Sequence, residues 1–114
     1  MGTFVITKRF NDEYKFVFTS RKGNPIFSSQ SYELKFECED GIEQFKNDFE
    51  KCEYVKQKAS SGKFFFKVMR DNQLFATSRK YSTELRLHKG IDEIKRTAAK
   101  AEILDFSQND LIFG

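Results

Sequence analysis

The chain has 114 residues, of which 39% are hydrophobic and 32% charged, and its formal net charge is +3 at pH 7. This length suits one domain, and a single proline with six glycines argues against a long linker or a disordered chain. No apolar stretch approaches the roughly 20 residues that a membrane span needs, and two cysteines are too few for a disulfide scaffold. Since no export signal is recognisable, we expect a cytoplasmic protein that does not contact membranes.

The sequence matches itself at a distance of about fifty residues. Tyr32 and Tyr81 occupy matching positions, and each is followed nine residues later by a glycine. The matching segments are 4–8 with 54–58, 14–18 with 64–68, and 41–46 with 90–95. We therefore predict a single domain over 1–114, made of two tandem repeats at about 3–51 and 53–106 and a C-terminal tail at 107–114.

Each repeat is expected to contain three strands followed by a helix. The apolar period is two residues in 14–18 and 64–68, which is typical of strands, and turn residues follow each segment. Apolar residues then recur in steps of four, three and four, which is typical of a helix with one buried face. These positions are Cys38, Ile42, Phe45 and Phe49 in the first repeat, and Leu87, Ile91, Ile94 and Ala98 in the second. Thr83 is placed to cap the second helix, whereas Leu34 at the equivalent position cannot cap through its side chain.

Two copies of about fifty residues are each too small to fold well alone, so we expect them to complete one another. The predicted fold class is α+β, with one antiparallel sheet, both helices on one face, and a pseudo-two-fold axis between the repeats. Gly41 and Gly90 fall inside the predicted helices, near the buried stripe, where glycine is costly. We interpret both as positions where the helix approaches the sheet closely.

The order of these elements resembles the YegP-like family of uncharacterised bacterial tandem-repeat domains. The resemblance rests on the aromatic strand 62–68, the segment 73–78, Tyr81 and the segment 90–95, and it extends over about 4–106. It implies strand–strand–strand–helix–strand units whose C-terminal strands are exchanged, with 101–106 as the last such strand. The family has no established activity, so the resemblance assigns no catalytic or binding residue.

The sequence contains no recognisable catalytic, metal or cofactor site. His88 is the only histidine and is expected on an exposed helix face. Cys38 lies on the apolar stripe and reads as a core residue, while Cys52 has no histidine predicted beside it to activate its thiol. Neither a zinc-ligand spacing nor a glycine-rich phosphate loop is present. We therefore predict a protein that is not an enzyme and requires no cofactor.

The two halves differ in charge, because residues 1–50 carry a net charge of −2 and residues 51–114 carry +5. The first helical region, 33–50, has seven acidic and two basic residues, whereas the second, 82–100, has three acidic and five basic residues. One hypothesis is that the helices lie side by side and that opposite charge favours this pairing. Drift after duplication is an equally good explanation.

The sheet face away from the helices is the candidate binding surface. By alternation it should display Lys15, Val17, Lys63, Phe65, Lys67 and Met69. We expect a protein-interaction or self-associating module that uses this face or the apolar tail residues Leu111–Phe113. The alternative is single-stranded nucleic-acid binding, in which Phe65 stacks on bases and the lysines attract phosphates.

Overall fold

The computed structural model describes residues 2–107. In chain order, its elements are β1 (Thr3–Lys8), β2 (Tyr14–Thr19), β3 (Pro25–Ser29), α1 (Lys35–Asp48), β4 (Glu53–Lys58), β5 (Phe64–Arg70), β6 (Gln73–Ser78), α2 (Glu84–Thr97), the 3-10 helix η1 (Ala98–Lys100) and β7 (Glu102–Asp105). We call β1 to α1 the first half and β4 to α2 the second half. The proposed Leu111–Phe113 interaction segment lies outside the described residues. Each half has three strands and then a helix, as predicted.

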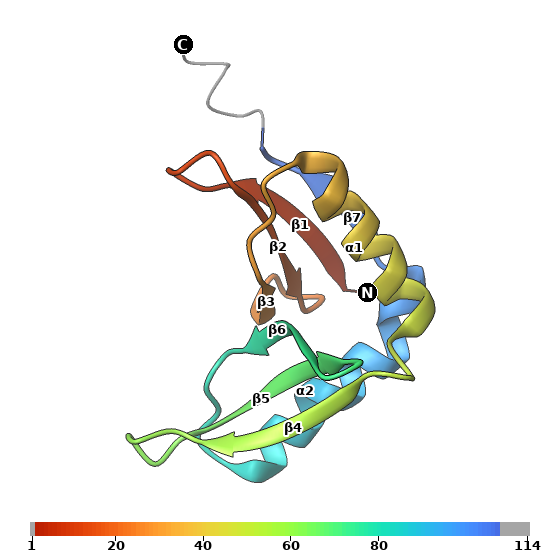
Figure 1. The fold of residues 1–114 in the computed structure, drawn as a ribbon. Coiled ribbons are helices and arrows are strands. Elements are labelled where there is room, and N and C mark those ends of the chain that lie inside the picture. The colour runs from red at the N-terminus through yellow and green to blue at the C-terminus, as the bar shows by residue number, and fades with distance from the viewer. Residues whose placement is uncertain (1, 108–114) are drawn as a thin grey trace.

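The strands form one mixed sheet in the order β4-β5-β6-β3-β2-β1-β7 (Figure 1). All pairings except one are antiparallel within the described residues, since β7 runs parallel to β1 with Thr3 opposite Glu102. The prediction of a purely antiparallel sheet is therefore wrong at this edge. The chain reaches β7 through the helix α2 rather than through a hairpin from β1, and only hairpins require the two strands to be antiparallel.

The exchanged C-terminal strand is present, because β7 follows α2 in the second half but pairs with β1 in the first. Lys35 at the start of α1 forms an ion pair with Asp105, which ties the helix to the end of β7. The first half contributes no equivalent strand, since the chain passes from α1 directly into β4, which forms the opposite edge of the sheet.

The two halves are joined through β3 and β6 at the centre of the sheet. Ser28 lies opposite Thr77, and the backbone hydrogen bonds Gln30 N to Phe75 O (3.2 Å) and Arg79 N to Ile26 O (2.9 Å) flank this pair. The Phe75 side chain, which belongs to β6, packs against Phe16 and Phe45 in the core of the first half. The sheet and the core are therefore both continuous across the joint.

Aromatic side chains dominate the buried face of the sheet. The six largest fully buried side chains are all phenylalanines: Phe4, Phe16, Phe18, Phe27, Phe45 and Phe66. Ring centroids lie 4.8 Å apart for Phe4 and Phe18, 5.3 Å for Phe27 and Phe45, and 5.2 Å for Phe45 and Phe75. Each buried phenylalanine contributes roughly 1.5–3 kcal/mol of transfer free energy, so a few positions stabilise a small domain.

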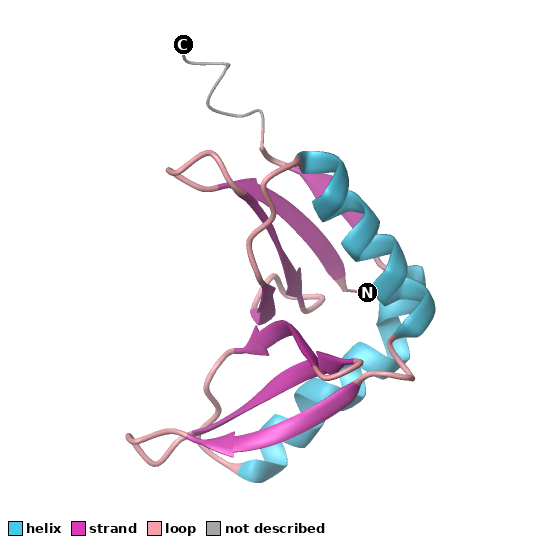
Figure 2. Ribbon diagram, viewed as in Figure 1, coloured by secondary structure: helices cyan, strands magenta, loops and turns pink. Residues whose placement is uncertain are grey.

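Both helices cover the same face of the sheet, with α1 along the first half and α2 along the second (Figure 2). The predicted buried stripes are confirmed, and they include Cys38 and Ile42 in α1 and Leu87 and Ile94 in α2. The prediction that the helices lie side by side is wrong. α1 packs on β2 and η1 while α2 packs on β5, and no described ion pair joins α1 to α2. Each helix covers the aromatic strands of its own half, which keeps the two apart.

Caps and turns have local explanations. The Thr83 hydroxyl accepts a hydrogen bond from Arg86 N at 3.1 Å, as predicted. At the start of α1, the Glu37 carboxylate instead accepts from the Leu34 N–H at 3.1 Å. In the β5–β6 hairpin, Asp71 and Asn72 both have positive φ, which is the backbone of a type I′ turn.

The same tyrosine–glycine contact occurs in both halves. The Tyr32 backbone exchanges two hydrogen bonds with that of Tyr14, both 2.7 Å, and its ring stacks on Phe16 at 6.4 Å. A Cβ built on Gly41 would lie 2.6 Å from Tyr32 Oη, so a larger residue fits beneath the ring only if the tyrosine shifts. Tyr81 and Gly90 repeat this arrangement in the second half. The predicted close approach is present, but a tyrosine ring, rather than the sheet itself, meets the helix.

We expect Gly41→Ala to lower the free energy of unfolding by about 1–3 kcal/mol, because the new methyl group displaces the Tyr32 ring. This loss exceeds the gain of roughly 0.5–1 kcal/mol that alanine brings inside a helix. Urea unfolding followed by circular dichroism measures the change. Glu43→Ala, an exposed site on the same helix, is the control and should stay within about 0.5 kcal/mol of the parent. Adding Tyr32→Phe to Gly41→Ala should recover part of the loss, and an unchanged stability of Gly41→Ala would contradict the steric argument.

Candidate functional site: two grooves of opposite charge

The residues predicted as a binding face lie on two strands that are not neighbours. Lys15 and Val17 lie on β2, and Lys63, Phe65, Lys67 and Met69 lie on or just before β5. Because β3 and β6 separate β2 from β5, the two groups are about 14 Å apart. Val17 and Lys67 belong to one row across the sheet, and the antiparallel pairings place Lys15 and Phe65 on opposite sides of that row.

The structure therefore brings Phe65 together with Lys63 and Lys67 but not with Lys15. Phe65 is partly exposed and lies opposite Gln57 of β4. A single-strand binder stacks successive bases on several aromatic rings. By alternation, the other aromatic residues of β1, β2 and β5 point to the helix side of the sheet, so this face offers one ring among lysines. The sheet face remains a candidate binding surface, but its exposed apolar area is smaller than the sequence predicted.

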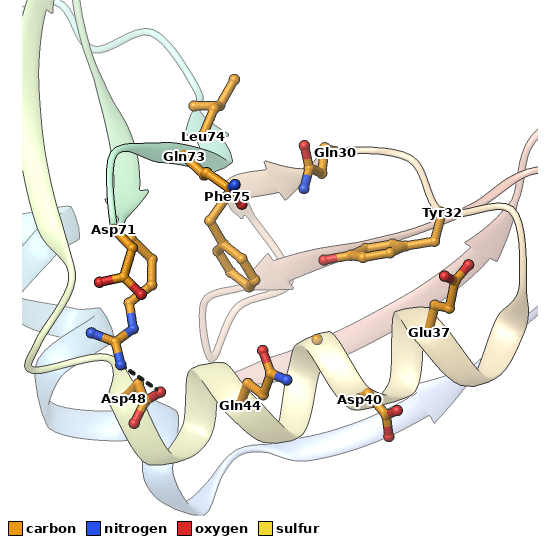
Figure 3. Close-up of a pocket in the computed structure, with 12 residues that line it drawn as sticks. Gln30, Tyr32, Glu37, Asp40, Gln44, Asp48, Asp71, Gln73, Leu74 and Phe75 are labelled. Atoms are coloured by element: carbon orange, nitrogen blue, oxygen red, sulfur yellow. Dashed lines mark hydrogen bonds and ion pairs between the residues drawn. The ribbon is translucent and has the colours of Figure 1, made fainter.

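The helix side of the molecule carries two grooves that the sequence did not predict. The first, which we call the acidic groove, has a volume of about 560 Å³ and lies between α1, the segment after β3 and the β5–β6 hairpin (Figure 3). Its lining includes Tyr32, Phe75 and Gly41 together with Gln30, Glu37, Asp40, Asp48, Arg70 and Asp71. In Figure 3 the rings of Tyr32 and Phe75 lie over α1 in the middle of the groove. The groove therefore has an aromatic interior and a charged rim.

The second, which we call the basic groove, has a volume of about 660 Å³ and lies between α2, the segment after β6 and the β2–β3 hairpin. Its lining includes Tyr81, Ile26, Pro25 and Gly90 together with Arg21, Lys22, Arg79, Arg86, Lys89 and Glu93. Its elements correspond one to one with those of the acidic groove. Tyr81 again lies above a helix glycine, and its ring stacks on Phe66 at 6.4 Å.

Buried serine hydroxyls hold the strand ends that lead into the grooves. Ser29 Oγ accepts from Phe16 N at 2.9 Å and donates to Gln30 O at 2.8 Å. Ser78 Oγ makes the equivalent bonds to Phe66 N and Arg79 O, at 2.8 and 2.7 Å. Each hydroxyl thus bridges neighbouring strands three residues before its tyrosine. The same local design places Tyr32 and Tyr81 in their grooves.

The two grooves have opposite charge at equivalent positions. Glu37 of the acidic groove corresponds to Arg86 of the basic groove, and Asp40 corresponds to Lys89, each at an offset of 49 residues. The acidic groove contains four carboxylates and one cation, Arg70, which pairs with Asp48 at 3.1 Å. The basic groove contains five cations and one carboxylate. The reversal of charge at this offset can be seen when the two halves of the sequence are aligned, but the sequence does not show that these residues line grooves.

Burial controls the titration of the groove tyrosines and of both thiols. Burial raises the pKa of Tyr32 to about 12, and it also raises the pKa of Tyr81 despite the nearby Arg79 guanidinium. Burial raises the pKa of Cys38 to about 12, and it raises the pKa of Cys52 in spite of the opposing effect of Arg70. At neutral pH both thiols are therefore protonated and weakly nucleophilic.

Residues 2–107 contain no group of three or more metal-ligating side chains close enough to hold an ion. In the same range no helix is long and apolar enough to cross a membrane.

His88 lies on an exposed part of α2 and is not among the lining residues of either groove. The grooves offer charged side chains, hydrogen-bonding groups and aromatic rings.

Comparison with known proteins places this architecture in a known group. Residues 59–105 match the model of a domain of unknown function, DUF1508. The UPF0339 protein in the ptx operon 5′ region of Stutzerimonas stutzeri is 30% identical over 106 residues, which cover 91% of this chain and 96% of that protein. The UPF0339 protein YegP of Escherichia coli K12 is 29% identical with the same coverage.

Solved structures give the same result. The solution NMR structure of yegP from E. coli, a protein of unknown function, has a TM-score of 0.83 and 28% sequence identity over 93% of each chain. The solution NMR structure of a UPF0339 protein from Shewanella oneidensis has the same TM-score and identity, over 93% of this chain and 92% of that one. Fold and sequence together define an α+β protein of a class whose function is unknown. The chain belongs to the YegP family, UPF0339.

We expect both thiols to react slowly with Ellman's reagent in the folded protein at neutral pH, because their raised pKa values leave little thiolate. Cys38 is fully buried and should react only on unfolding, whereas the partly exposed Cys52 should react first but more slowly than free cysteine. Cys52→Ser and Cys38→Ser assign the two phases. A fast native-state reaction at either site would overturn the structural role of these cysteines.

Proposed function

We propose that this chain is a non-enzymatic interaction module that self-associates through its two grooves. The observation that carries the proposal is that the molecule has two equivalent grooves, one lined mainly by acidic residues and the other mainly by basic residues. Among the described residues no ion pair connects the two grooves, so their charges do not neutralise each other within the molecule. A second copy offers the complementary charge for both.

The proposal includes a tandem duplication, with repeats at about 3–51 and 53–106 in a single domain. It is supported by equivalent hydrogen bonds at Ser29 and Ser78 and by equivalent glycine contacts at Tyr32 and Tyr81. Duplication creates two equivalent grooves related by an internal pseudo-two-fold axis. Divergence in charge then makes the two surfaces complementary rather than identical.

Opposite charge suits a closed dimer. Both grooves lie on the helix side of the sheet, so a two-fold rotation can bring the acidic groove of one copy against the basic groove of the other. The same rotation brings the reciprocal pair together, and both contacts form at once. Charged rims contribute mainly to specificity and association rate, while apolar groove residues such as the partly exposed Phe75 and the exposed Pro25 add buried area.

The absence of enzymatic activity and a cytoplasmic location are also proposed. Both thiols are protonated at neutral pH, and the grooves combine no nucleophile with a neighbouring general base. Cys38 and Cys52 are free thiols, which is compatible with a reducing compartment. Nucleic-acid binding on the sheet face is kept as an outcome of the test below.

We expect a concentration-dependent dimer in light scattering that weakens as salt rises, because exposed charge pairs are screened. Lys89→Asp and Asp40→Lys each place like charges opposite one another, so each should weaken dimerisation by about tenfold or more. The double variant exchanges the charges between the grooves and should dimerise again. An equimolar mixture of the two single variants should form a heterodimer.

Lys67→Asp on the sheet face is the matched control, with the same change in charge, and should leave the dimer unchanged. If Lys67→Asp disrupts association and Lys89→Asp does not, the sheet face is the interface. If the parent remains monomeric at every concentration and salt, self-association is excluded. Salt-sensitive binding of labelled single-stranded RNA or DNA that Phe65→Ala and Lys67→Ala weaken would instead favour the nucleic-acid function.

A further inference from the structure

The basic groove concentrates positive charge around an aromatic floor. Its five cations come from three separate parts of the chain: Arg21 and Lys22 from the β2–β3 hairpin, Arg79 from the segment after β6, and Arg86 and Lys89 from α2. They surround Tyr81, and the Arg79 guanidinium lies 5.3 Å from the centre of the Tyr81 ring. Glu93 is the only carboxylate in the lining.

None of these five cations forms an ion pair within 4 Å among the residues that the structure describes. The ion pairs in that range use Lys8, Lys35, Lys56 and Arg70. Arg70 makes a useful contrast, since the one cation of the acidic groove is neutralised by Asp48 beside it. Five neighbouring unpaired cations repel one another, and binding an anion removes this repulsion.

The fold does not require this positive charge. At the equivalent positions the acidic groove carries Gln30 for Arg79, Glu37 for Arg86 and Asp40 for Lys89, around the same tyrosine and glycine. The packing tolerates either sign at these positions, so Arg79, Arg86 and Lys89 are not explained by the stability of the fold. Their convergence on one cavity points to a ligand.

We infer that the basic groove is a binding site for a small phosphorylated molecule. Guanidinium groups bind phosphate oxygens with two parallel hydrogen bonds, and Arg79 and Arg86 offer two such groups from two different elements of the groove. Its volume of about 660 Å³ is in the range of small-ligand sites. The exposed Pro25 supplies apolar surface for the organic part of the ligand, beside the largely buried Ile26 and Tyr81.

This inference does not depend on self-association, but the two interact. A bound polyanion occupies the groove that would receive the acidic groove of a second copy. Phosphate binding is therefore expected to lower the dimer fraction. Binding itself can be measured on the Asp40→Lys variant, which keeps every residue of the basic groove and is expected to dimerise more weakly than the parent.

The experiment is an NMR titration of the labelled Asp40→Lys protein with inorganic pyrophosphate and, separately, with adenosine triphosphate. We expect saturable amide shifts centred on Arg79, Tyr81 and Arg86. Replacing Arg86 and Lys89 with glutamate removes two charge-assisted hydrogen bonds and should weaken binding about a hundredfold. Arg86→Lys keeps the charge but loses the forked geometry and should weaken binding about tenfold.

The pair Lys63→Glu and Lys67→Glu on the sheet face changes net charge equally and should leave the affinity within about threefold. The amide spectrum of each variant verifies that it is folded. The inference is overturned if shifts do not saturate, if the sheet-face control weakens binding as much as the groove variant, or if a polyglutamate peptide binds more tightly than both phosphates. A single-stranded oligonucleotide that binds more tightly than adenosine triphosphate would overturn the small-molecule assignment. If phosphates bind while the parent protein never dimerises, the site stands and the self-association proposal fails.

Discussion

The pairing of β3 with β6 is the contact on which the rest of the structure depends. Three residue pairs, from Phe27 opposite Ser78 to Ser29 opposite Ala76, join the two halves into one sheet. Each half has about fifty residues and could not bury enough surface to offset its chain entropy. The joint extends the sheet across both halves and lets Phe75 enter the core of the first. Both grooves lie beside it, because the chain turns towards each helix immediately after β3 and β6.

Packing and charge are separable in this fold. The buried parts are repeated closely, including the serine bridge, the tyrosine stacked on a strand phenylalanine, and the glycine beneath it. The groove rims are solvated, where reversing a charge such as Glu37 to Arg86 changes stability little. The stability of the fold therefore constrains the charge of the groove rims least. The difference in charge, rather than the shared core, is where specificity can reside.

Local patterns predicted the elements well because their causes are local. Alternation identified the strands around Phe16 and Phe66, the four-three-four spacing identified both helices, and Thr83 caps α2 through its hydroxyl. Three features were not predictable in this way. The parallel direction of β7, the separation of the helices and the distance between Lys15 and Phe65 all depend on strand order, which period-two alternation does not encode.

The sequence alone determined the elements and the apolar face of each, since these follow from side-chain periodicity. It also determined that the pair Tyr32 and Gly41 recurs as Tyr81 and Gly90, since the two halves of the sequence are similar. It also contained the opposite charges at equivalent helix positions. Only the tertiary structure decided that these charges surround cavities, because each groove is assembled from a helix, a strand end and a hairpin of the other half. Convergence of such distant segments depends on how the two halves pack, and no short pattern in the chain records it.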